Sequence, residues 1–289
     1  MNKTIQSSLQ NLGDHSAIES LHQVAGGDIN EAFYVSTREN SYFIKTNEDI
    51  PTHFFEVEAK GLELIRNTNT IRVPYVYYFD RPENGASGAI IMEWISSSPQ
   101  SDTAERLGRK LAKMHQFEND RYGLEDDTFV GTLAQPNGLF EDWIVYYQTK
   151  RLLPQFELAN RQGVMNHERR NKMEQLISQL EKWIPKRPGA SLLHGDLWGG
   201  NWMAGPDGEP CLIDPSVVYG DRSFELAFTE LFGGFPKQFY EAYNDMHSLP
   251  SNYRDTKEIY QLFYLLVHLN LFGESYGRAV DRILASYIG

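Results

Sequence analysis

The sequence has a single cysteine, no excess of basic residues and no long hydrophobic run. One cysteine, Cys211, excludes an internal disulfide framework and a metal site built from several thiolates. A net charge of −12 at pH 7 would repel a polyphosphate backbone, which argues against nucleic acid as a partner. No apolar stretch approaches the length that spans a bilayer, and residues 1–8 lack the apolar core of a secretory signal. We therefore expect a cytoplasmic protein that binds neither nucleic acid nor membranes.

The 289 residues are enough for two domains, since single domains commonly have about 100–200 residues. The first third alternates short apolar segments with polar turns, which predicts a small sheet with one helix. Beyond residue 102 the apolar spacing becomes helical, and segment 96–99, rich in serine and ending in proline, is the best linker candidate. These patterns predict an α+β protein with an N-terminal domain over residues 1–95 and a larger, mostly helical domain over residues 96–289. The expected strands are 21–25, 32–35, 42–45 and 89–92, and the expected helices are 54–66, 103–117, 139–159 with a break at Pro154, 169–183 and 260–272.

Three polar residues of the second domain have the spacing of a phosphoryl-transfer centre. Asp196 follows His-Gly, Asn201 stands five residues later, and Asp214 ends a short apolar run. A carboxylate at the first position can accept the proton of an acceptor hydroxyl, while amide and carboxylate oxygens are ligands for Mg²⁺. We interpret Asp196 as a general base, and Asn201 and Asp214 as magnesium ligands. Each residue taken alone could equally serve a turn or a loop, so the interpretation rests on the three together.

The segment between Asn201 and Asp214 predicts a β-hairpin, because two short apolar runs flank the turn-forming residues 205–210. A hairpin centred between Asp207 and Gly208 would place Asn201 directly opposite Asp214. The two side chains would then be in reach of one cation.

The predicted helix of the first domain has a carboxylate on its apolar stripe, where Glu58 stands among Phe55, Leu62 and Ile65. A carboxylate in that position needs a partner, and Lys45 at the end of a predicted strand is a natural one. Such an ion pair would direct the ammonium toward the phosphates of a nucleotide. The alternative is that Glu58 lies at the edge of the stripe and both groups are solvated.

Two further segments of the first domain are candidates for nucleotide contact. Gly26 and Gly27 lie between predicted strands, where backbone N–H groups can approach phosphates closely, although paired glycines are also ordinary turn residues. The segment at the end of this domain can present backbone groups to an adenine edge, or it is simply the exit from a buried strand. Its residues are Met92, Glu93, Trp94 and Ile95.

With these residues assembled, the chain resembles the fructosamine kinase (ketosamine-3-kinase) family, within the wider aminoglycoside-phosphotransferase and protein-kinase-like fold. The resemblance covers most of the chain. Its most selective parts are Trp198 inside the run 194–201, the segment Gln135-Pro136-Asn137-Gly138 and the segment Leu231-Phe232-Gly233-Gly234-Phe235. Further matching segments are 26–33, 58–62, 107–115, 142–143, 151–152 and 219–222.

The resemblance implies a bilobal kinase fold, with a small N-terminal lobe that binds ATP and a helical C-terminal lobe. It also implies ATP- and Mg²⁺-dependent phosphorylation of a ketosamine, free or protein-bound, at the hydroxyl of its third sugar carbon. The phosphorylated adduct is unstable and decomposes, so the resemblance implies a role in the repair of glycated amines. Trp198 flanks the proposed base, where its ring either stacks on a sugar or belongs to the core, and by this resemblance Gln135 and Asn137 become further candidate substrate residues.

The sequence departs from the family pattern at three positions. Ser223 stands where similar members usually have an acidic residue, and Glu225 stands where they have aspartate, which weakens any role assigned there. Asp28 occupies the place of a cysteine that is tied to redox control in some members. We therefore do not predict such control.

Two alternatives are open. The first keeps the fold and changes the acceptor to an aminoglycoside, choline or another small hydroxyl compound; Trp198 and the segment 135–138 argue against it. The second is a nucleotide-binding regulator without turnover. Five intact residues argue against that reading, since such proteins typically lose one of them: Lys45, Glu58, Asp196, Asn201 and Asp214.

Overall fold

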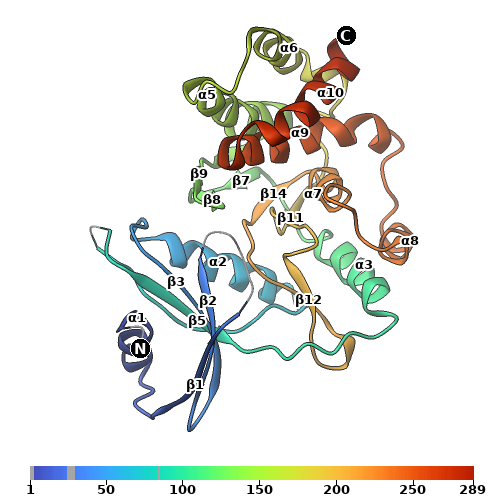
Figure 1. Cartoon of the computed structure of the whole chain (residues 1–289). Helices are drawn as coiled ribbons and strands as arrows, with labels where there is room; N and C mark the ends of the chain where they lie inside the picture. Colours follow the sequence, from blue (N-terminus) through green and yellow to red (C-terminus); the bar gives the residue numbers. More distant parts are fainter. Residues whose placement is uncertain (1–2, 25–29, 84) are drawn as a thin grey trace. The chain divides into compact units, whose positions relative to one another are not determined.

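The computed structural model describes residues 3–24, 30–83 and 85–289, which group into two compact units (Figure 1). Unit 1 comprises Met1–Met114, Gly199–Ser216 and Pro236–Asp245, and unit 2 comprises His115–Trp198, Val217–Phe235 and Met246–Gly289. Two later segments thus pack with the N-terminal residues. The division at residues 95 and 96 stays a prediction.

Unit 1 contains an antiparallel five-stranded sheet in the order β1-β2-β3-β5-β4. Alternate residues of its strands point to one face, where Ile5 and Leu9 of α1 pack against Val35, Ile44 and Ile91. The predicted strands are present with small shifts at their ends, apart from residue 25, which lies outside the described residues, whereas α1 was not predicted. The elements are α1 (Lys3–Leu12), β1 (Ile18–Gln23), β2 (Glu31–Thr37), β3 (Ser41–Asn47), β4 (Val76–Phe79) and β5 (Gly88–Glu93).

The other elements of unit 1 are three helices and a hairpin. Helix α2 (Phe54–Asn67) confirms the predicted helix, and its stripe of Phe55, Leu62 and Ile65 is fully buried. Gly108 in α3 lets this helix pack closely on α8, because a Cβ atom there would lie 2.2 Å from the Phe239 carbonyl oxygen. The remaining bounds are α3 (Thr103–Met114), β12 (Trp202–Ala204), η3 (Pro206–Gly208), β13 (Pro210–Leu212) and α8 (Lys237–Met246).

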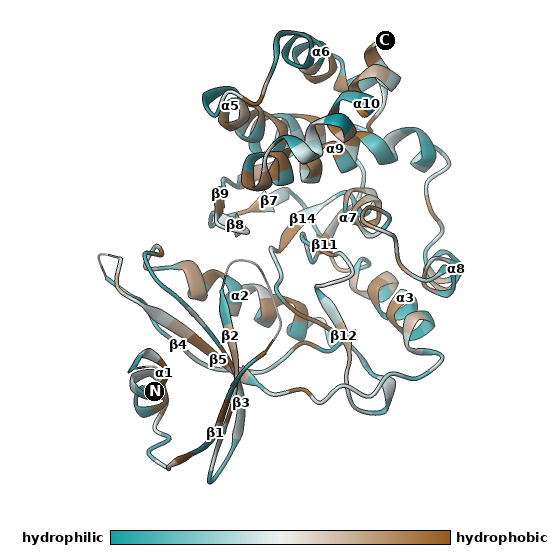
Figure 2. Ribbon diagram, viewed as in Figure 1, coloured by the Kyte–Doolittle hydropathy of each residue, from teal (hydrophilic) through white to brown (hydrophobic). Residues whose placement is uncertain are grey.

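Unit 2 is built around α9 (Tyr253–Phe272), which confirms the predicted buried helix and extends it toward its N-terminus. Figure 2 shows the apolar residues of this helix in brown. It packs against α5, α7 and α10, and its Tyr260 hydroxyl accepts a hydrogen bond from the buried Trp143 indole. The helices are α4 (Trp143–Tyr146), η1 (Tyr147–Leu152), α5 (Leu153–Arg161), α6 (His167–Ser178), η2 (Leu180–Lys182), α7 (Arg222–Thr229), η4 (Glu274–Tyr276) and α10 (Gly277–Ile288).

A second five-stranded sheet, in the order β10-β7-β14-β11-β6, was not predicted. Most of its strands have only two or three residues, too few to show an alternating pattern in the sequence. Strand β11 of this sheet ends one residue before His194 and leads directly into the run 194–201, which contains Asp196. The strands of unit 2 are β6 (Glu118–Asn119), β7 (Tyr122–Leu124), β8 (Thr128–Val130), β9 (Leu133–Gln135), β10 (Gly138–Phe140), β11 (Ala190–Leu193) and β14 (Val218–Gly220).

The predicted helix break at Pro154 is wrong, because the helical path continues from α4 through the π-helical segment η1 into α5. Proline has no N–H to donate to the carbonyl four residues earlier, that of Lys150. The Arg151 guanidinium donates to this carbonyl instead, at 3.0 Å. The wider π turn and this substitute donor let the helix pass the proline.

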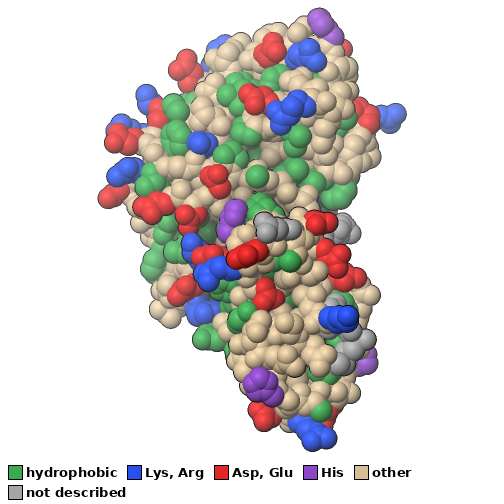
Figure 3. Space-filling model, turned by 90° about the vertical axis from the view of Figure 1, so that its left-hand side faces the viewer, with side chains coloured by type: hydrophobic (Ala, Val, Ile, Leu, Met, Phe, Trp, Pro, Cys, Tyr) green, Lys and Arg blue, Asp and Glu red, His purple; other side chains and the backbone are tan. Residues whose placement is uncertain are grey.

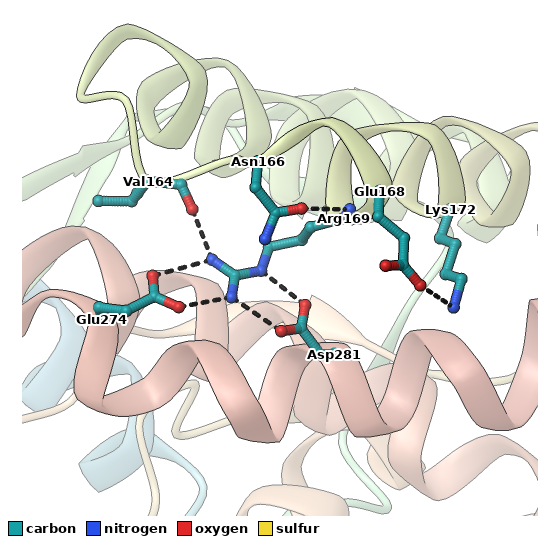
Figure 4. A network of polar contacts seen from close by, with 7 residues as sticks. All are labelled: Val164, Asn166, Glu168, Arg169, Lys172, Glu274 and Asp281. Atoms are coloured by element: carbon teal, nitrogen blue, oxygen red, sulfur yellow. Dashed lines mark hydrogen bonds and ion pairs between the residues drawn. The ribbon is translucent and has the colours of Figure 1, made fainter.

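A buried arginine joins α6 to the C-terminal elements (Figure 4). The Arg169 guanidinium donates to both Glu274 oxygens and to both Asp281 oxygens at 2.7–3.0 Å. The hydrogen bonds that Arg169 donates to Asp281 and Glu274 raise the pKa of Arg169 further above its usual range. These contacts compensate the positive charge of Arg169, whose side chain is only 1% exposed.

Acidic and basic side chains are interspersed over the face of the molecule shown in Figure 3. Among the residues that the structure describes, no helix is both long and apolar enough to cross a membrane.

Candidate active site

Lys45, Glu58 and Asp214 form a charged group in unit 1. Lys45 lies on β3, Glu58 on α2, and Asp214 follows the β12–β13 hairpin. Lys45 Nζ donates a hydrogen bond to Glu58 Oε1 at 2.7 Å and a second one to Asp214 Oδ1. The expected Lys45–Glu58 ion pair is therefore present, and it includes Asp214, which the sequence did not connect to this pair.

The ammonium of Lys45 is a fixed cation near neutral pH. Its residue is only 4% exposed, and this burial alone would lower the pKa of Lys45. The carboxylates of Asp214 and Glu58 outweigh that effect and raise the pKa above the usual lysine value. Burial raises the pKa of Glu58, with Lys45 opposing the rise and Asp214 adding to it. The Asp214 side chain is 35% exposed, which makes it the most accessible member of the group.

The hairpin that carries Asn201 and Asp214 is present, but its register differs from the prediction. The backbone N–H of Ile213 donates to the Asn201 carbonyl at 3.0 Å, so Asn201 lies opposite Ile213. The expected direct pairing with Asp214 is wrong by one residue. The cause is the turn, in which Asp207 adopts a left-handed conformation with φ 55° and becomes the centre of the hairpin.

Asp214 itself has a left-handed backbone, with φ 56°. Such a conformation in a residue other than glycine costs about 1–3 kcal/mol and is concentrated at functional sites. The amide oxygen of Asn201 and the carboxylate of Asp214 have the donor chemistry that Mg²⁺ prefers. Over residues 3–24, 30–83 and 85–289, no group of three or more His, Cys, Asp or Glu side chains could hold a metal ion. A magnesium ion here would therefore need phosphate oxygens and water as further ligands.

The candidate adenine segment has buried side chains at both of its ends. Met92 is 1% exposed and Ile95 6% exposed, so only backbone groups of these two residues are candidates for contact with a base. The Glu93 carboxylate accepts from the Arg72 guanidinium at 2.5 Å and from the Tyr75 N–H at 3.2 Å. The Trp94 ring packs edge-on against that of Tyr34, with centroids 4.6 Å apart. Gly26 and Gly27 lie outside the described residues.

The candidate base belongs to unit 2, in the loop after β11. Asp196 is half-buried, and its N–H donates to His194 Nδ1 at 3.3 Å. The preceding carbonyl, that of Gly195, accepts a hydrogen bond from the buried Tyr264 hydroxyl of α9 at 3.0 Å. Gly195 has φ 82°, which a side chain would strain. The backbone next to Asp196 is therefore tied to the central helix of its unit.

Glu225 of α7 holds the same loop from the other side. Its Oε2 accepts a hydrogen bond from the Gly195 N–H at 2.6 Å, and its Oε1 lies 2.8 Å from His115 Nε2. Glu225, His115 and His194 are fully buried. Burial would raise the pKa of Glu225, but the hydrogen bond from His115 and the charges of both histidines lower it on balance. The sequence offered only one signal for this residue, its departure from the aspartate of the family pattern.

Replacing Glu225 with alanine should destabilise the protein by about 2–4 kcal/mol, because two buried partners lose their hydrogen bonds. Glu225→Gln keeps an acceptor for Gly195 and should recover most of the loss. The pKa of Glu225 is lower in the folded protein than its usual value, so ionisation of this carboxyl stabilises the folded state at pH values above the usual glutamate pKa. This stabilisation is lost as the pH falls through the pKa of Glu225 in the folded state. Urea unfolding at several pH values measures both effects, and equal stability of Glu225→Ala and wild type would contradict them.

The three candidate substrate residues lie in different environments. Trp198 is 41% exposed, as a side chain that stacks on a sugar must be. Gln135 and Asn137 are only 2% and 3% exposed. The Asn137 side-chain oxygen accepts from the Tyr146 hydroxyl at 2.7 Å and from the Arg151 guanidinium at 2.9 Å. The Gln135 amide donates to Thr128 Oγ1 at 3.0 Å. These contacts favour a structural role for the two amides, and their substrate role stays a prediction.

We expect Asn137→Ala to destabilise the protein by about 1–3 kcal/mol, because buried donors of Tyr146 and Arg151 lose their acceptor. The KM for the phosphoryl acceptor should stay within about twofold of wild type. Thermal unfolding and steady-state kinetics on the same preparation test both statements. A large rise in the KM for the acceptor with unchanged stability would contradict the structural role and show that Asn137 binds substrate.

The family model described as fructosamine kinase matches residues 1–289, the whole chain. The chain belongs to the fructosamine kinase family. A probable ketoamine kinase from Enterococcus faecium is 37% identical over 265 residues, which cover 91% of this chain and 94% of that protein. The chloroplastic protein-ribulosamine 3-kinase of Arabidopsis thaliana is 34% identical, covering 96% of this chain and 85% of its own.

Solved structures agree with this fructosamine kinase assignment. A Haemophilus somnus protein assigned as a fructosamine-3-kinase superposes with a TM-score of 0.87 at 28% identity, covering 99% of this chain and 97% of its own. The aminoglycoside phosphotransferase APH(4)-Ia shares the fold alone, with a TM-score of 0.63 at 16% identity, covering 97% of this chain and 97% of its own. The predicted α+β, kinase-like fold is confirmed, and membership in a kinase family makes this chain a phosphotransferase that uses ATP.

Proposed function

We propose that this fructosamine kinase family member transfers the γ-phosphoryl group of ATP to the hydroxyl on the third carbon of a ketosamine. The full-length family match carries the proposal, and relatives named for ketoamine and ribulosamine support this class of acceptor. Phosphorylation at that carbon makes the adduct unstable, so the consequence would be release of the free amine. A role in deglycation follows.

The donor side of the reaction rests on unit 1. The Lys45 ammonium, held by Glu58, supplies a buried positive charge that pairs with nucleotide phosphates. Asn201 and Asp214 would hold Mg²⁺, which neutralises the charge that develops on the transferred phosphoryl group. Because Asp214 also accepts from Lys45, this carboxylate would fix the cationic side chain and the metal relative to each other.

The acceptor side rests on unit 2. Asp196 would accept the proton of the sugar hydroxyl as the bond to phosphorus forms. Glu225 and Tyr264 bond the N–H and the carbonyl of Gly195, which limits movement of the backbone that carries Asp196. A base fixed in this way needs no reorganisation during transfer. The exposed Trp198 ring, two residues after Asp196, would stack on the sugar.

A panel of acceptors tests the proposal. Ribulose-, erythrulose- and fructose-amines should each be assayed with ATP and Mg²⁺, next to an aminoglycoside and choline. We expect ATP consumption with at least one ketosamine and identification of its product by ³¹P NMR as a phosphate ester at the third carbon. Turnover restricted to the aminoglycoside or choline would contradict the proposed acceptor, and no ATP consumption with any compound would favour a regulator.

A cytoplasmic location stays a prediction.

A further inference from the structure

Four aromatic side chains of unit 2 gather where the Leu231–Phe235 segment meets the end of α9. The His268 ring centroid lies 4.6 Å from that of Phe232, 5.6 Å from that of Phe272 and 5.0 Å from that of Tyr276. We call these four residues the aromatic cluster. Phe232 is 44% exposed and Phe272 48% exposed. The cluster thus keeps large ring surfaces in contact with water.

A chain of contacts within unit 2 joins the aromatic cluster to the loop of the candidate base. The Phe228 ring is 6.0 Å from the Phe232 ring and stacks on that of Tyr264, with centroids 3.6 Å apart and planes at 1°. The Tyr264 hydroxyl in turn donates to the Gly195 carbonyl, next to Asp196. Two ring contacts and one hydrogen bond therefore separate the cluster from the backbone of Asp196.

The backbone holds the Phe232 ring in its exposed position against a conformational cost. Phe232 has φ 54°, and the two residues that follow, Gly233 and Gly234, have φ 97° and 74°. Glycine adopts this region freely, but a phenylalanine there costs about 1–3 kcal/mol. A phenylalanine in this strained backbone that still exposes 44% of its surface gives up part of the free energy that full burial would contribute, which points to a ligand.

The electrostatics of the aromatic cluster favour a cationic ligand. Burial lowers the pKa of His268, and its Nδ1 is 2.8 Å from the Tyr264 carbonyl, so the ring is neutral near neutral pH. In the described part of the chain, the Lys and Arg side chains that lie over aromatic rings do so elsewhere, for example Arg66 over Tyr75. The negative faces of the cluster rings are thus not used by these protein cations.

We propose that Phe232, Phe272 and Tyr276 bind the protonated amine of the acceptor through cation–π contacts. The inference rests on the proposed function, because a ketosamine bears a secondary amine that is protonated near neutral pH. Its sugar would be presented to Asp196, and its amine, with whatever substituent it carries, would lie against the cluster. The exposure of the cluster leaves room for a large substituent, including a side chain of a glycated protein.

The experiment compares two acceptors that differ at a single atom, which is a protonated nitrogen in one and an uncharged oxygen in the other. One is a ketosamine with a short N-alkyl group, and the other is the ether with oxygen in place of the amine nitrogen. Wild type should have a lower KM for the amine. Phe232→Leu and Phe272→Leu, which keep apolar bulk and remove the π face, should raise the KM for the amine about 3- to 20-fold. The KM for the ether should change less than twofold. Phe117→Leu is the matched control, since Phe117 is a similarly exposed residue (45%) of the same unit outside the cluster.

The outcomes separate this inference from the proposed function. If wild type phosphorylates neither acceptor, both the proposed function and the inference built on it fail. If wild type phosphorylates the amine and the two cluster variants leave its KM unchanged, only the inference fails. Equal rises in KM for amine and ether would show a general apolar contact and would also overturn the cation site. Phe232→Trp, which keeps a π face, should retain the preference for the amine.

Discussion

Asp196→Asn should lower kcat by about 10²–10⁴-fold, the range expected for loss of a general base, while the Kd for nucleotide changes little. The amide keeps the size of the carboxylate but cannot take the proton of the acceptor hydroxyl. Nucleotide affinity should be preserved because the candidate phosphate partner, Lys45, and the candidate metal ligand, Asp214, are in unit 1. Steady-state kinetics with the preferred ketosamine, together with calorimetric titration of a non-hydrolysable ATP analogue, measure both quantities.

Asp120→Asn is the control for this change, since Asp120 is an exposed aspartate of the same unit. Its kinetics should match those of wild type. The Asp196 variant should also fold normally, because the contacts of Gly195 with Glu225 and Tyr264 involve its backbone only. A kcat close to that of wild type would remove Asp196 from the role of base.

The parts of the site that could be predicted from sequence are those that depend on local spacing. Lys45 and Glu58 were paired because a carboxylate on an apolar helix stripe needs a partner, and the two side chains are hydrogen-bonded. The hairpin between Asn201 and Asp214 was predicted because apolar runs flank residues that favour turns. Its register was missed by one residue, since the left-handed conformation of Asp207 cannot be inferred from a turn rich in glycine and proline.

The parts that were missed depend on contacts between distant residues. Glu225 and His115 meet although 110 positions separate them, and no periodicity of the sequence connects them. The second sheet was missed because its strands are very short, and the helix through Pro154 was missed because a buried guanidinium replaces the absent N–H. Gln135 and Asn137 were assigned to substrate by resemblance, whereas their burial and hydrogen bonds favour a structural reason for the segment.

Asp214→Ala should reduce kcat at saturating Mg²⁺ by about 10²–10³-fold, because a metal that neutralises phosphoryl charge contributes several kcal/mol to transition-state binding. The dependence of the rate on Mg²⁺ concentration should shift to higher concentration or disappear. The loss has a second cause, since Lys45 keeps only Glu58 as a carboxylate partner. Asp214→Asn should fall between alanine and wild type, because its amide oxygen can still bind a metal and asparagine tolerates the left-handed backbone.

Asp207→Ala is the matched control for backbone strain. Asp207 lies in the same hairpin, has φ 55° and is exposed, whereas Asp214 has φ 56° and contacts Lys45. The backbone cost of placing alanine is similar at the two positions, so a difference in Mg²⁺ dependence between the two variants reports the loss of the Asp214 carboxylate. Identical Mg²⁺ titrations for Asp214→Ala, Asp207→Ala and wild type would contradict the ligand assignment. In that case the strained backbone of Asp214 would serve only the ion pair with Lys45.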